Sequence, residues 1–290
     1  MVFDELDVRR SAMAYLAECT SSSGGVVTRA DLEAFTYNDQ PLKLIDTGRG
    51  IRNPRELLAT LTILTSPSGP YLDVETADGL WRYAYRTGDP DGGDNRKLRK
   101  AYELGLPVII LQKIADAVFV PTYPVYVVAD VPEQRFVEIA VDESLRFFGP
   151  GVPEDVRDYA ERLTRLRLHQ PVFRARVLLA YDTACAICRL RHGDLLDAAH
   201  IRSDAEGGQP VVSNGLALCK IHHAAYDRRI IGIRPDYVVQ VRSDVLLEVD
   251  GPMLRHGLQE VHGAPLVLPA RIRDRPDRDL LAQRYEAFVG

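Results

Sequence analysis

Two short pairs of metal-ligating residues constrain the fold of this chain more than any other feature of its sequence. Cys185 and Cys188 are separated by two residues, and Cys219 and His222 repeat that spacing further along the chain. Two such pairs, roughly 30 residues apart, are typical of a structural zinc site with four tetrahedral ligands. Buried apolar cysteines are the alternative, but they do not explain why a histidine takes the fourth position. We therefore expect a zinc ion held by three cysteines and one histidine.

The length and composition of the chain indicate two folded domains. At 290 residues it exceeds what one hydrophobic core usually supports, and its hydrophobic fraction of 46% is ordinary for a globular protein. Glycine and proline cluster at residues 149–153, which indicates a boundary. We therefore expect an N-terminal domain at residues 1–150, a helical linker at residues 151–180, and a C-terminal domain at residues 181–290 that ends in a β-hairpin and a helix.

The first 150 residues combine helical and strand-like patterns. Apolar residues at helical spacing predict an opening helix over residues 4–19, and Thr28 is a suitable cap for a second helix over residues 29–35. A third helix fits residues 95–104, because Gly105 suits the position that follows a helix C-terminus. Strand-like runs occupy residues 57–65, 80–86, 107–111, 117–120 and 126–129. The expected fold class is α+β, with helices packed on a curved or barrel-like sheet.

Further polar residues lie between and just after the two metal-ligating pairs. Asp197 and His200 precede a glycine turn, Asn214 precedes Gly215, and His223 directly follows His222. Beyond this segment, strand-like runs are expected at residues 230–233, 237–242 and 245–249, with Ser243 and Asp244 as a hairpin turn, and a helix at residues 277–288.

This order of residues resembles the HNH nucleases, in which a strand carries the first histidine, a loop the asparagine and a helix the last histidine. The resemblance covers about residues 181–232 and implies a ββα-metal fold. A neutral imidazole can take a proton from water at physiological pH, so we expect His200 to be the general base. The reaction also needs a cation on the scissile phosphate, and we expect His223 to hold Mg²⁺ or a similar divalent ion. The resemblance implies that Asn214 pins the strand to the loop and orients His200, although Asn-Gly is also a common turn dipeptide.

The second ligand of the catalytic ion is left open by the sequence. Many HNH nucleases carry that ligand immediately before the general base, where this chain has Ala199. Asp197 is one substitute, but on a strand it lies on the face opposite His200 unless a twist or bulge intervenes. Asp227 is the other, because it lies four residues after His223 and therefore on the same face of a helix.

Arginines offer candidate contacts for a DNA backbone, although the formal net charge of −5 argues mildly against nucleic acid as a partner. Residues 157–176 hold six arginines against two acids, and Arg174 and Arg176 are the candidates nearest the nuclease segment. Arg49 and Arg52 lie in a glycine-flanked stretch of the N-terminal domain. The alternative for all of them is an ordinary solvated surface.

Aromatic, acidic and basic residues gather in the N-terminal domain between residues 70 and 98. A flipped-base pocket requires such residues: aromatic faces to stack on the base, and a carboxylate to accept from the cytosine amino group. The segment resembles the SRA (SET- and RING-associated) readers of modified cytosine, which have a PUA-like curved barrel. The resemblance implies that Tyr71 and either Tyr85 or Tyr83 sandwich the base, with Trp81 nearby, while Asp73 reads its edge. Alternatively, Trp81, Tyr83 and Tyr85 form one strand whose aromatics pack the domain, and Asp73 is a turn residue.

Together the two halves resemble the modification-dependent restriction endonucleases that join an SRA reader to an HNH nuclease. The resemblance implies a type IV-like enzyme that flips 5-methylcytosine or 5-hydroxymethylcytosine out of double-stranded DNA and hydrolyses nearby phosphodiester bonds. One HNH site cuts one strand, so a double-strand break requires a homodimer or two sequential nicks. Two alternatives are kept: an HNH enzyme whose N-terminal domain does not read modified bases, and a zinc-stabilised DNA-binding module without catalysis.

Features of membrane and secreted proteins are not found in the sequence. Its apolar runs fall short of the roughly 18 residues that span a bilayer, and its first residues lack the apolar core of a signal peptide. We therefore expect a cytoplasmic protein that does not bind membranes.

Overall fold

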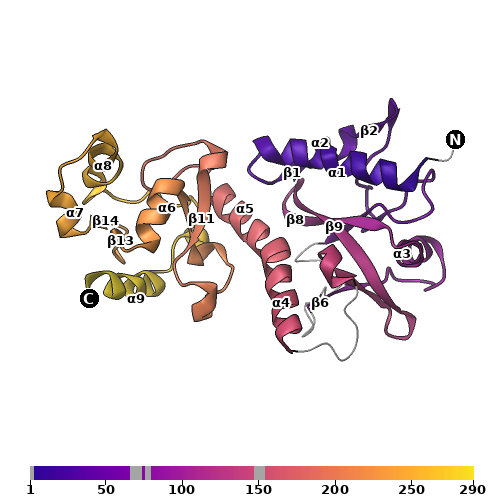
Figure 1. The fold of residues 1–290 in the computed structure, drawn as a ribbon. Helices are drawn as coiled ribbons and strands as arrows, with labels where there is room; N and C mark the ends of the chain where they lie inside the picture. The colour runs from indigo at the N-terminus through magenta and orange to yellow at the C-terminus, as the bar shows by residue number, and fades with distance from the viewer. Residues whose placement is uncertain (1–2, 66–73, 76–79, 147–153) are drawn as a thin grey trace. The chain divides into compact units, whose positions relative to one another are not determined.

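A computed structural model describes residues 3–65, 74–75, 80–146 and 154–290 of the protein (Figure 1). The chain divides into two compact units, Met1–Val172 (the N-terminal unit) and Phe173–Gly290 (the C-terminal unit). The division falls inside the linker expected at residues 151–180. Among the helices that the structure describes, none is both long and apolar enough to cross a membrane.

An eight-stranded sheet that curls into a half-barrel forms the centre of the N-terminal unit. Its strands follow the order β4-β5-β8-β9-β10-β7-β6, and β1 pairs with β9 outside this path. Register shifts within the β8–β9 and β9–β10 pairs mark bulges, which bend strands and increase their twist. The bounds are β1 (Val27–Thr28), β4 (Ile51–Arg52), β5 (Thr62–Thr65), β6 (Val74–Glu75), β7 (Trp81–Ala84), β8 (Pro107–Ala115), β9 (Val118–Val131) and β10 (Phe136–Ala140).

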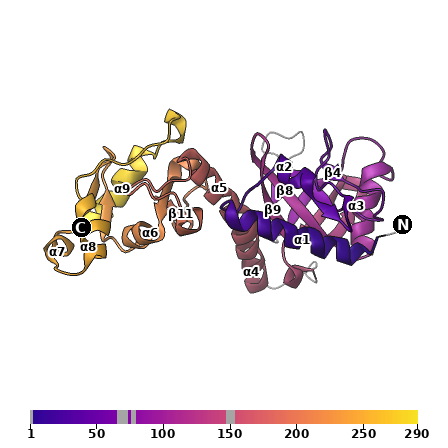
Figure 2. The same ribbon diagram turned by 90° about the horizontal axis from the view of Figure 1, so that it is seen from above.

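Helices cover both faces of this sheet, which explains why β8 is apolar at consecutive positions. Val108 and Ile110 belong to the core that includes α3 (Gly93–Glu103), whereas Ile109 and Leu111 belong to the core that includes α1 (Glu5–Ser22) and α2 (Arg29–Ala34). Figure 2 shows α1 lying along the sheet. The smaller elements of this unit are β2 (Thr36–Tyr37), β3 (Gln40–Pro41) and the 3₁₀ helices η1 (Pro132–Gln134) and η2 (Glu143–Leu145).

The predicted helices of this unit are confirmed, with ends that differ by a few residues. Asp4 caps α1 by accepting from the backbone of Leu6 and Asp7, and Thr28 forms a capping box with Asp31 at the start of α2. Gly105 has a φ of +60°, which favours glycine directly after α3. The division of residues 117–129 into two strands was wrong, because β9 continues through Pro121 and Pro124.

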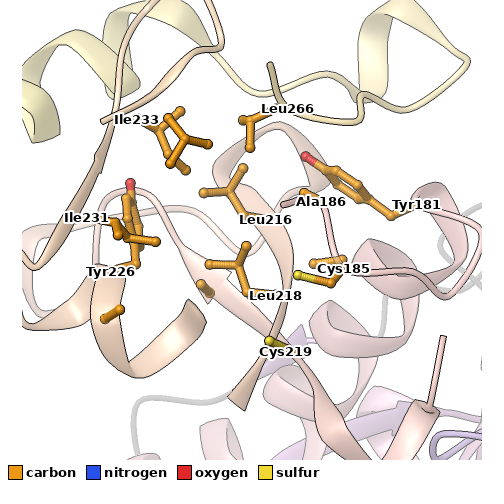
Figure 3. Packing of buried hydrophobic residues seen from close by; sticks show 14 of the residues in the cluster. Tyr181, Cys185, Ala186, Leu216, Leu218, Cys219, Tyr226, Ile231, Ile233 and Leu266 are labelled. Carbon is orange, nitrogen blue, oxygen red and sulfur yellow. The ribbon is translucent and has the colours of Figure 1, made fainter. Parts of the chain in front are cut away.

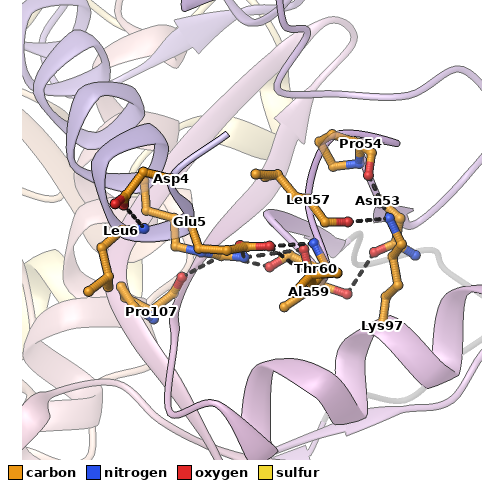
Figure 4. Close-up of polar contacts among 12 residues, drawn as sticks. Asp4, Glu5, Leu6, Asn53, Pro54, Leu57, Ala59, Thr60, Lys97 and Pro107 are labelled. Carbon is orange, nitrogen blue, oxygen red and sulfur yellow. Dashed lines mark hydrogen bonds and ion pairs between the residues drawn. The ribbon is translucent and has the colours of Figure 1, made fainter. Parts of the chain in front are cut away.

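The strand predicted at residues 57–65 is confirmed only at its end, and a buried arginine explains the rest. Figure 4 shows Ala59, Thr60 and Pro107 near Glu5 of α1, with dashed lines for the polar contacts in this region. The side chain of Arg9 is fully buried and donates to the carbonyl oxygens of Thr60 (2.7 Å), Pro107 (2.7 Å) and Ala59 (3.2 Å). It also forms a 2.8 Å ion pair with Glu5 one turn earlier on α1. The carbonyls of residues 59 and 60 therefore bind a guanidinium instead of a neighbouring strand, and β5 begins only at Thr62.

Helices connect the two units along the chain. Helix α4 (Glu154–Thr164) continues through a π-helical turn, η3 (Arg165–His169), into α5 (Gln170–Ala180). Within the N-terminal unit, Arg167 of this turn bonds to the Asp142 carboxylate (2.5 Å) and the Tyr123 carbonyl (2.8 Å). The π-helical turn is thereby anchored to the N-terminal unit before the chain enters α5.

After most of α5, the C-terminal unit continues with a hairpin followed by a helix. Strands β11 (Leu196–His200) and β12 (Gly215–Cys219) are antiparallel, and α6 (Lys220–Asp227) follows at once. A second antiparallel pair, β13 (Ile231–Ile233) with β14 (Val239–Val241), packs with them around one core (Figure 3). The other elements are α7 (Ser243–Leu247), α8 (Pro252–Gly257), α9 (Arg278–Val289) and the 3₁₀ helices η4 (Gly193–Leu195), η5 (Asp204–Glu206), η6 (Val212–Asn214), η7 (Gln259–Val261) and η8 (Ile272–Asp274).

The prediction for residues 243–249 was wrong. Residues 243–247 form α7 instead of a turn followed by a strand. Val245 is buried, but Leu247 and Val249 are 83% and 99% exposed, so the apolar residues do not form a strand with one buried face. Serine and aspartate also favour helix starts. The observed hairpin turn lies earlier, where Tyr237 has a φ of +68°. The predicted C-terminal helix is confirmed as α9, with Asp277 as its cap.

Candidate active site

The two metal-ligating pairs of the sequence meet in one cluster. The ligand atoms of Cys185, Cys188, Cys219 and His222 all lie within 4.8 Å of one another. Cys188 Sγ lies 3.9 Å from Cys219 Sγ, and His222 Nδ1 lies 3.1 Å and 3.5 Å from the sulfurs of Cys219 and Cys185. A tetrahedral zinc ion with bonds of about 2.3 Å separates its ligands by about 3.8 Å. The four side chains therefore fit zinc.

The orientation of His222 supports the same fit. Its Nε2 lies 2.8 Å from the Gly257 carbonyl, to which it donates, so the lone pair of Nδ1 faces the sulfurs. The hydrogen bond from Cys219 lowers the pKa of Cys185 well below its usual range, although burial acts in the opposite direction. Cys185 is therefore the thiolate of this pair, because the same bond raises the pKa of Cys219. Figure 3 shows Cys185 and Cys219 beside the apolar core of the unit. The cluster thus links β12, α6 and α8.

The β11–β12 register positions the residues predicted for catalysis. His200 ends β11 opposite Gly215, and Asp197 lies opposite Leu218. Since α6 follows β12 without an intervening loop, His223 on its first turn is brought next to β11. Strand, strand and helix form the ββα arrangement that the sequence predicted.

His200 is held between α5 and the 3₁₀ helix η5. Its ring stacks on Phe173, with centroids 4.0 Å apart and planes 15° from parallel. Nε2 is buried without a hydrogen-bond partner among the described residues, and Asp204 Oδ1 lies 3.6 Å away. Burial lowers the pKa of His200, although Asp204 acts in the opposite direction. The imidazole is therefore neutral at physiological pH, as a general base must be.

Asn214 ties together both ends of the loop between β11 and β12. The side chain is 1% exposed; its Oδ1 accepts from Arg202 N (2.9 Å), and its Nδ2 donates to the carbonyls of Arg202 (3.0 Å) and Gln209 (2.9 Å). A Cβ on Gly208 would lie 2.0 Å from the Arg202 carbonyl, so only glycine fits there. Asn214 thus fixes the backbone directly after His200, and these three hydrogen bonds do not involve the imidazole.

His223 lies between the two acids that the sequence proposed as metal ligands. Asp197 Oδ2 is 3.6 Å from Nδ1 of His223, whereas Asp227 Oδ2 is 3.4 Å from Nε2. Asp197 raises the pKa of His223 more than burial lowers it. Burial alone would raise the pKa of Asp197, but His223 and Lys220 together lower it well below its usual range. Among the described residues, the ligand atoms of three or more side chains come close together in the zinc-type cluster alone. The ligand atoms of Asp197, His223 and Asp227 do not converge to the same extent.

The arginines predicted to contact DNA differ in how they are used. Arg174 donates to the carbonyls of Gly193 (3.1 Å) and Leu196 (2.9 Å), so its guanidinium is occupied inside the protein. Arg176 is partly buried, and desolvation lowers its pKa. Arg52 donates to the Lys43 carbonyl and lies 3.7 Å from Asp46, whereas Arg49 is exposed.

Three of the four aromatic residues predicted for a base pocket are core residues. Trp81, Tyr83 and Tyr85 are 7%, 5% and 2% exposed and belong to the core between the sheet and α3. Tyr83 Oη donates to the Gly50 carbonyl (3.2 Å), and Tyr85 Oη bonds to Asp130. The structure thus agrees with the alternative in which one strand packs the domain. Tyr71 and Asp73 lie outside the described residues.

Several residues near the site had no distinct signal in the sequence. Phe173 comes from α5, and Lys220, which bonds to Asp197 at 2.9 Å, is the first residue of α6. Arg284 reaches the site from α9, where its guanidinium lies over the Tyr226 ring at 4.9 Å and its NH2 is 3.7 Å from Asp227. Phe173 and Arg284 are distant in sequence from their partners, so only the fold brings them there.

Comparison with known proteins identifies the central part of this unit. Residues 185–234 match the family described as HNH endonuclease, which supports a nuclease. No curated protein matches the chain. A solved structure of the modification-dependent TagI restriction endonuclease is 19% identical with a TM-score of 0.33, covering 79% of this chain and 81% of that one. The type IV phosphorothioation-dependent restriction endonuclease ScoMcrA is 13% identical with a TM-score of 0.22, and the alignment covers 80% of this chain but only 52% of that one.

Proposed function

We propose that this chain is a metal-dependent endonuclease that hydrolyses phosphodiester bonds of DNA with the HNH-type site of its C-terminal unit. One observation carries the proposal: inside the segment that matches the HNH endonuclease family, a neutral, half-buried His200 and a second histidine, His223, lie on adjacent elements of a ββα unit. Asn214 supplies the third residue type of the motif and fixes the loop between the two strands.

The chain's own residues account for the proton transfer. His200 takes the proton of the attacking water, and its lowered pKa keeps the imidazole unprotonated for that role. Phe173 stacks on the ring and limits its rotation, while Asn214 holds the backbone that follows. His223 and an adjacent carboxylate are the residues that would hold Mg²⁺ or another divalent cation. Such a cation, when bound, offsets the negative charge that grows on the nonbridging and leaving oxygens.

A structural zinc ion is the second metal of the proposal. Cys185, Cys188, Cys219 and His222 would hold it, and their spacing supports this assignment. Zinc bound by these residues would hold α6 against the hairpin, and the His222–Gly257 hydrogen bond extends the link to α8. His222 and His223 therefore have separate roles although they are neighbours in sequence.

The N-terminal unit is proposed to select the target. Its sequence resemblance to modified-cytosine readers implies double-stranded DNA whose 5-methylcytosine or 5-hydroxymethylcytosine flips into a pocket, and its curled sheet is compatible with such a reader. Because Trp81, Tyr83 and Tyr85 pack the core, the pocket residues to test first are Tyr71 and Asp73. A homodimer would place two nuclease sites on one duplex and cut both strands.

Plasmids that differ only in their cytosine modification test this function. Zinc-loaded protein with Mg²⁺ or Mn²⁺ is expected to cut the modified plasmid and to bind modified duplexes more tightly than unmodified ones. Equal binding and equal cutting would show that the N-terminal unit does not read the modification. Binding without cutting under every divalent ion would instead identify a zinc-stabilised DNA-binding module.

A further inference from the structure

We infer that Asp197 is a positioning residue that orients His223, and that Asp227 is the carboxylate that shares the catalytic cation with it. This inference rests on the proposed nuclease function and assigns separate roles to two acids that the sequence could not distinguish. Three observations support it. Each acid faces a different nitrogen of His223, the two carboxylates differ in the groups that already contact them, and the general base lies on one side of β11.

The two ring nitrogens of His223 face different acids. Asp197 Oδ2 is 3.6 Å from Nδ1, and Asp227 Oδ2 is 3.4 Å from Nε2. The nitrogens of an imidazole point away from each other, and only an unprotonated nitrogen can bind a cation. One cation on His223 can therefore have only one of these acids beside it. The other acid is left to accept the proton on the opposite nitrogen, which fixes the tautomer.

Both oxygens of the Asp197 carboxylate already have N–H or basic groups of the protein beside them. Oδ2, the oxygen that faces His223, also accepts from Lys220 Nζ at 2.9 Å. Oδ1 accepts from the backbone of Ala198 at 3.2 Å and lies 3.5 Å from Nε of Arg174. A divalent cation on this carboxylate would lie close to the Lys220 ammonium and would be repelled by it.

Asp227 is more accessible to a cation. Its side chain is 56% exposed, and it follows His223 by four residues on the same face of α6. Besides His223, the described structure gives it one basic contact, Arg284 at 3.7 Å from Oδ1. Asp227 Oδ2 and His223 Nε2 therefore have fewer basic groups beside them than Asp197 Oδ2 and His223 Nδ1 have.

The position of the general base favours the same side. Asp197 and His200 are three residues apart on β11, so their side chains leave the strand on opposite faces. Asp204 and, to a smaller extent, Asp227 raise the pKa of His200, whereas Asp197 is not among the groups that shift it. A cation beside Asp227 would therefore share its side of the site with the water that His200 activates.

Arg174 completes the positioning group. From α5 it holds the carbonyls of Gly193 and Leu196 and approaches Asp197, which fixes the start of β11. Arg174, Asp197 and His223 then form a chain from α5 to α6 in which a carboxylate orients a metal-binding histidine. Outer carboxylates of this kind typically change metal affinity by about 10-fold to 100-fold, less than the ligand itself.

Binding of Mn²⁺ to zinc-loaded protein, measured by electron paramagnetic resonance, tests the assignment independently of catalysis. Asp227→Asn is expected to abolish saturable Mn²⁺ binding, whereas Asp197→Asn retains one site with an affinity about 10-fold lower. Saturating Mn²⁺ should restore most of the DNA-nicking rate of Asp197→Asn but not that of Asp227→Asn. Asp236→Asn, which removes one exposed charge from the same unit, is the matched control and should bind Mn²⁺ like the wild type.

The outcome is decided by which of the two variants loses more Mn²⁺ affinity. Equal losses, or a larger loss for Asp197→Asn, would overturn the inference, provided that both variants keep their zinc content and thermal transition. Failure of the proposed function is recognised separately, because the wild-type protein would then neither bind Mn²⁺ at this site nor cut DNA.

Discussion

Replacing Asn214 by alanine tests whether one buried amide holds the loop of the candidate active site. The substitution removes three hydrogen bonds, one from Arg202 N and two to the carbonyls of Arg202 and Gln209. Each is worth about 1 kcal/mol in net stability. Gln209 is exposed, so water can replace the bond to its carbonyl. We therefore expect the C-terminal unit to lose about 2 kcal/mol, which corresponds to about 8 °C in its thermal midpoint.

The loss of activity should exceed what this destabilisation explains. At a temperature where the variant is still folded, the nicking rate should fall by roughly 100-fold, because the backbone after His200 is no longer fixed and small displacements of a catalytic group are costly. Calorimetry and nicking of supercoiled plasmid measure the two effects. Gln209→Ala is the control, since it leaves the backbone carbonyl in place. An Asn214→Ala protein that melts and cuts like the wild type would refute this account of the loop.

Three further predictions concern the zinc site, the general base His200 and the core of the N-terminal unit. Removing zinc with a chelator, or replacing Cys219 by serine, should unfold the ββα part of the C-terminal unit, seen as a loss of helical circular dichroism together with nicking. Phe173→Leu keeps an apolar side chain but loses the ring stacked on His200; we expect a roughly 10-fold lower nicking rate at saturating DNA with less than about 1.5 kcal/mol of destabilisation. Arg9→Met leaves three carbonyls and Glu5 without their buried partner, and should destabilise the N-terminal unit by about 4 kcal/mol in denaturant unfolding. Nicking of the modified plasmid by the folded variant should be unchanged.

Local spacing explains why much of the candidate site could be predicted from the sequence. Cys185 and Cys188 share one turn, Cys219 and His222 share another, and His223 follows directly, so their chemistry is visible without knowledge of the fold. The β11–β12 register then places His200 opposite Gly215, and α6 follows β12 directly. By contrast, the contacts of Phe173, Gly257 and Arg284 depend on α5, α8 and α9, which no local pattern relates to the site.

The N-terminal unit shows where sequence patterns could not decide. Alternation of aromatic and polar residues correctly predicted a strand at residues 81–84, but it could not show that the aromatic face is covered by α3. The run at residues 57–61 had the composition of a strand, yet Arg9 binds its carbonyls from another element. Residues 245–249 lack a partner strand, and composition alone does not reveal a missing partner.

Nicking of supercoiled plasmid by His200→Ala measures the central claim most directly. With zinc-loaded protein and Mg²⁺ or Mn²⁺, the wild type should convert the plasmid to open-circular or linear DNA, and the variant should be slower by roughly 100-fold to 10,000-fold. His192→Ala, an exposed histidine of the same unit, should cut like the wild type. If His200→Ala cut at the wild-type rate, or if the wild type cut no DNA with any divalent ion, the assignment of this site as a nuclease with His200 as its base would be contradicted.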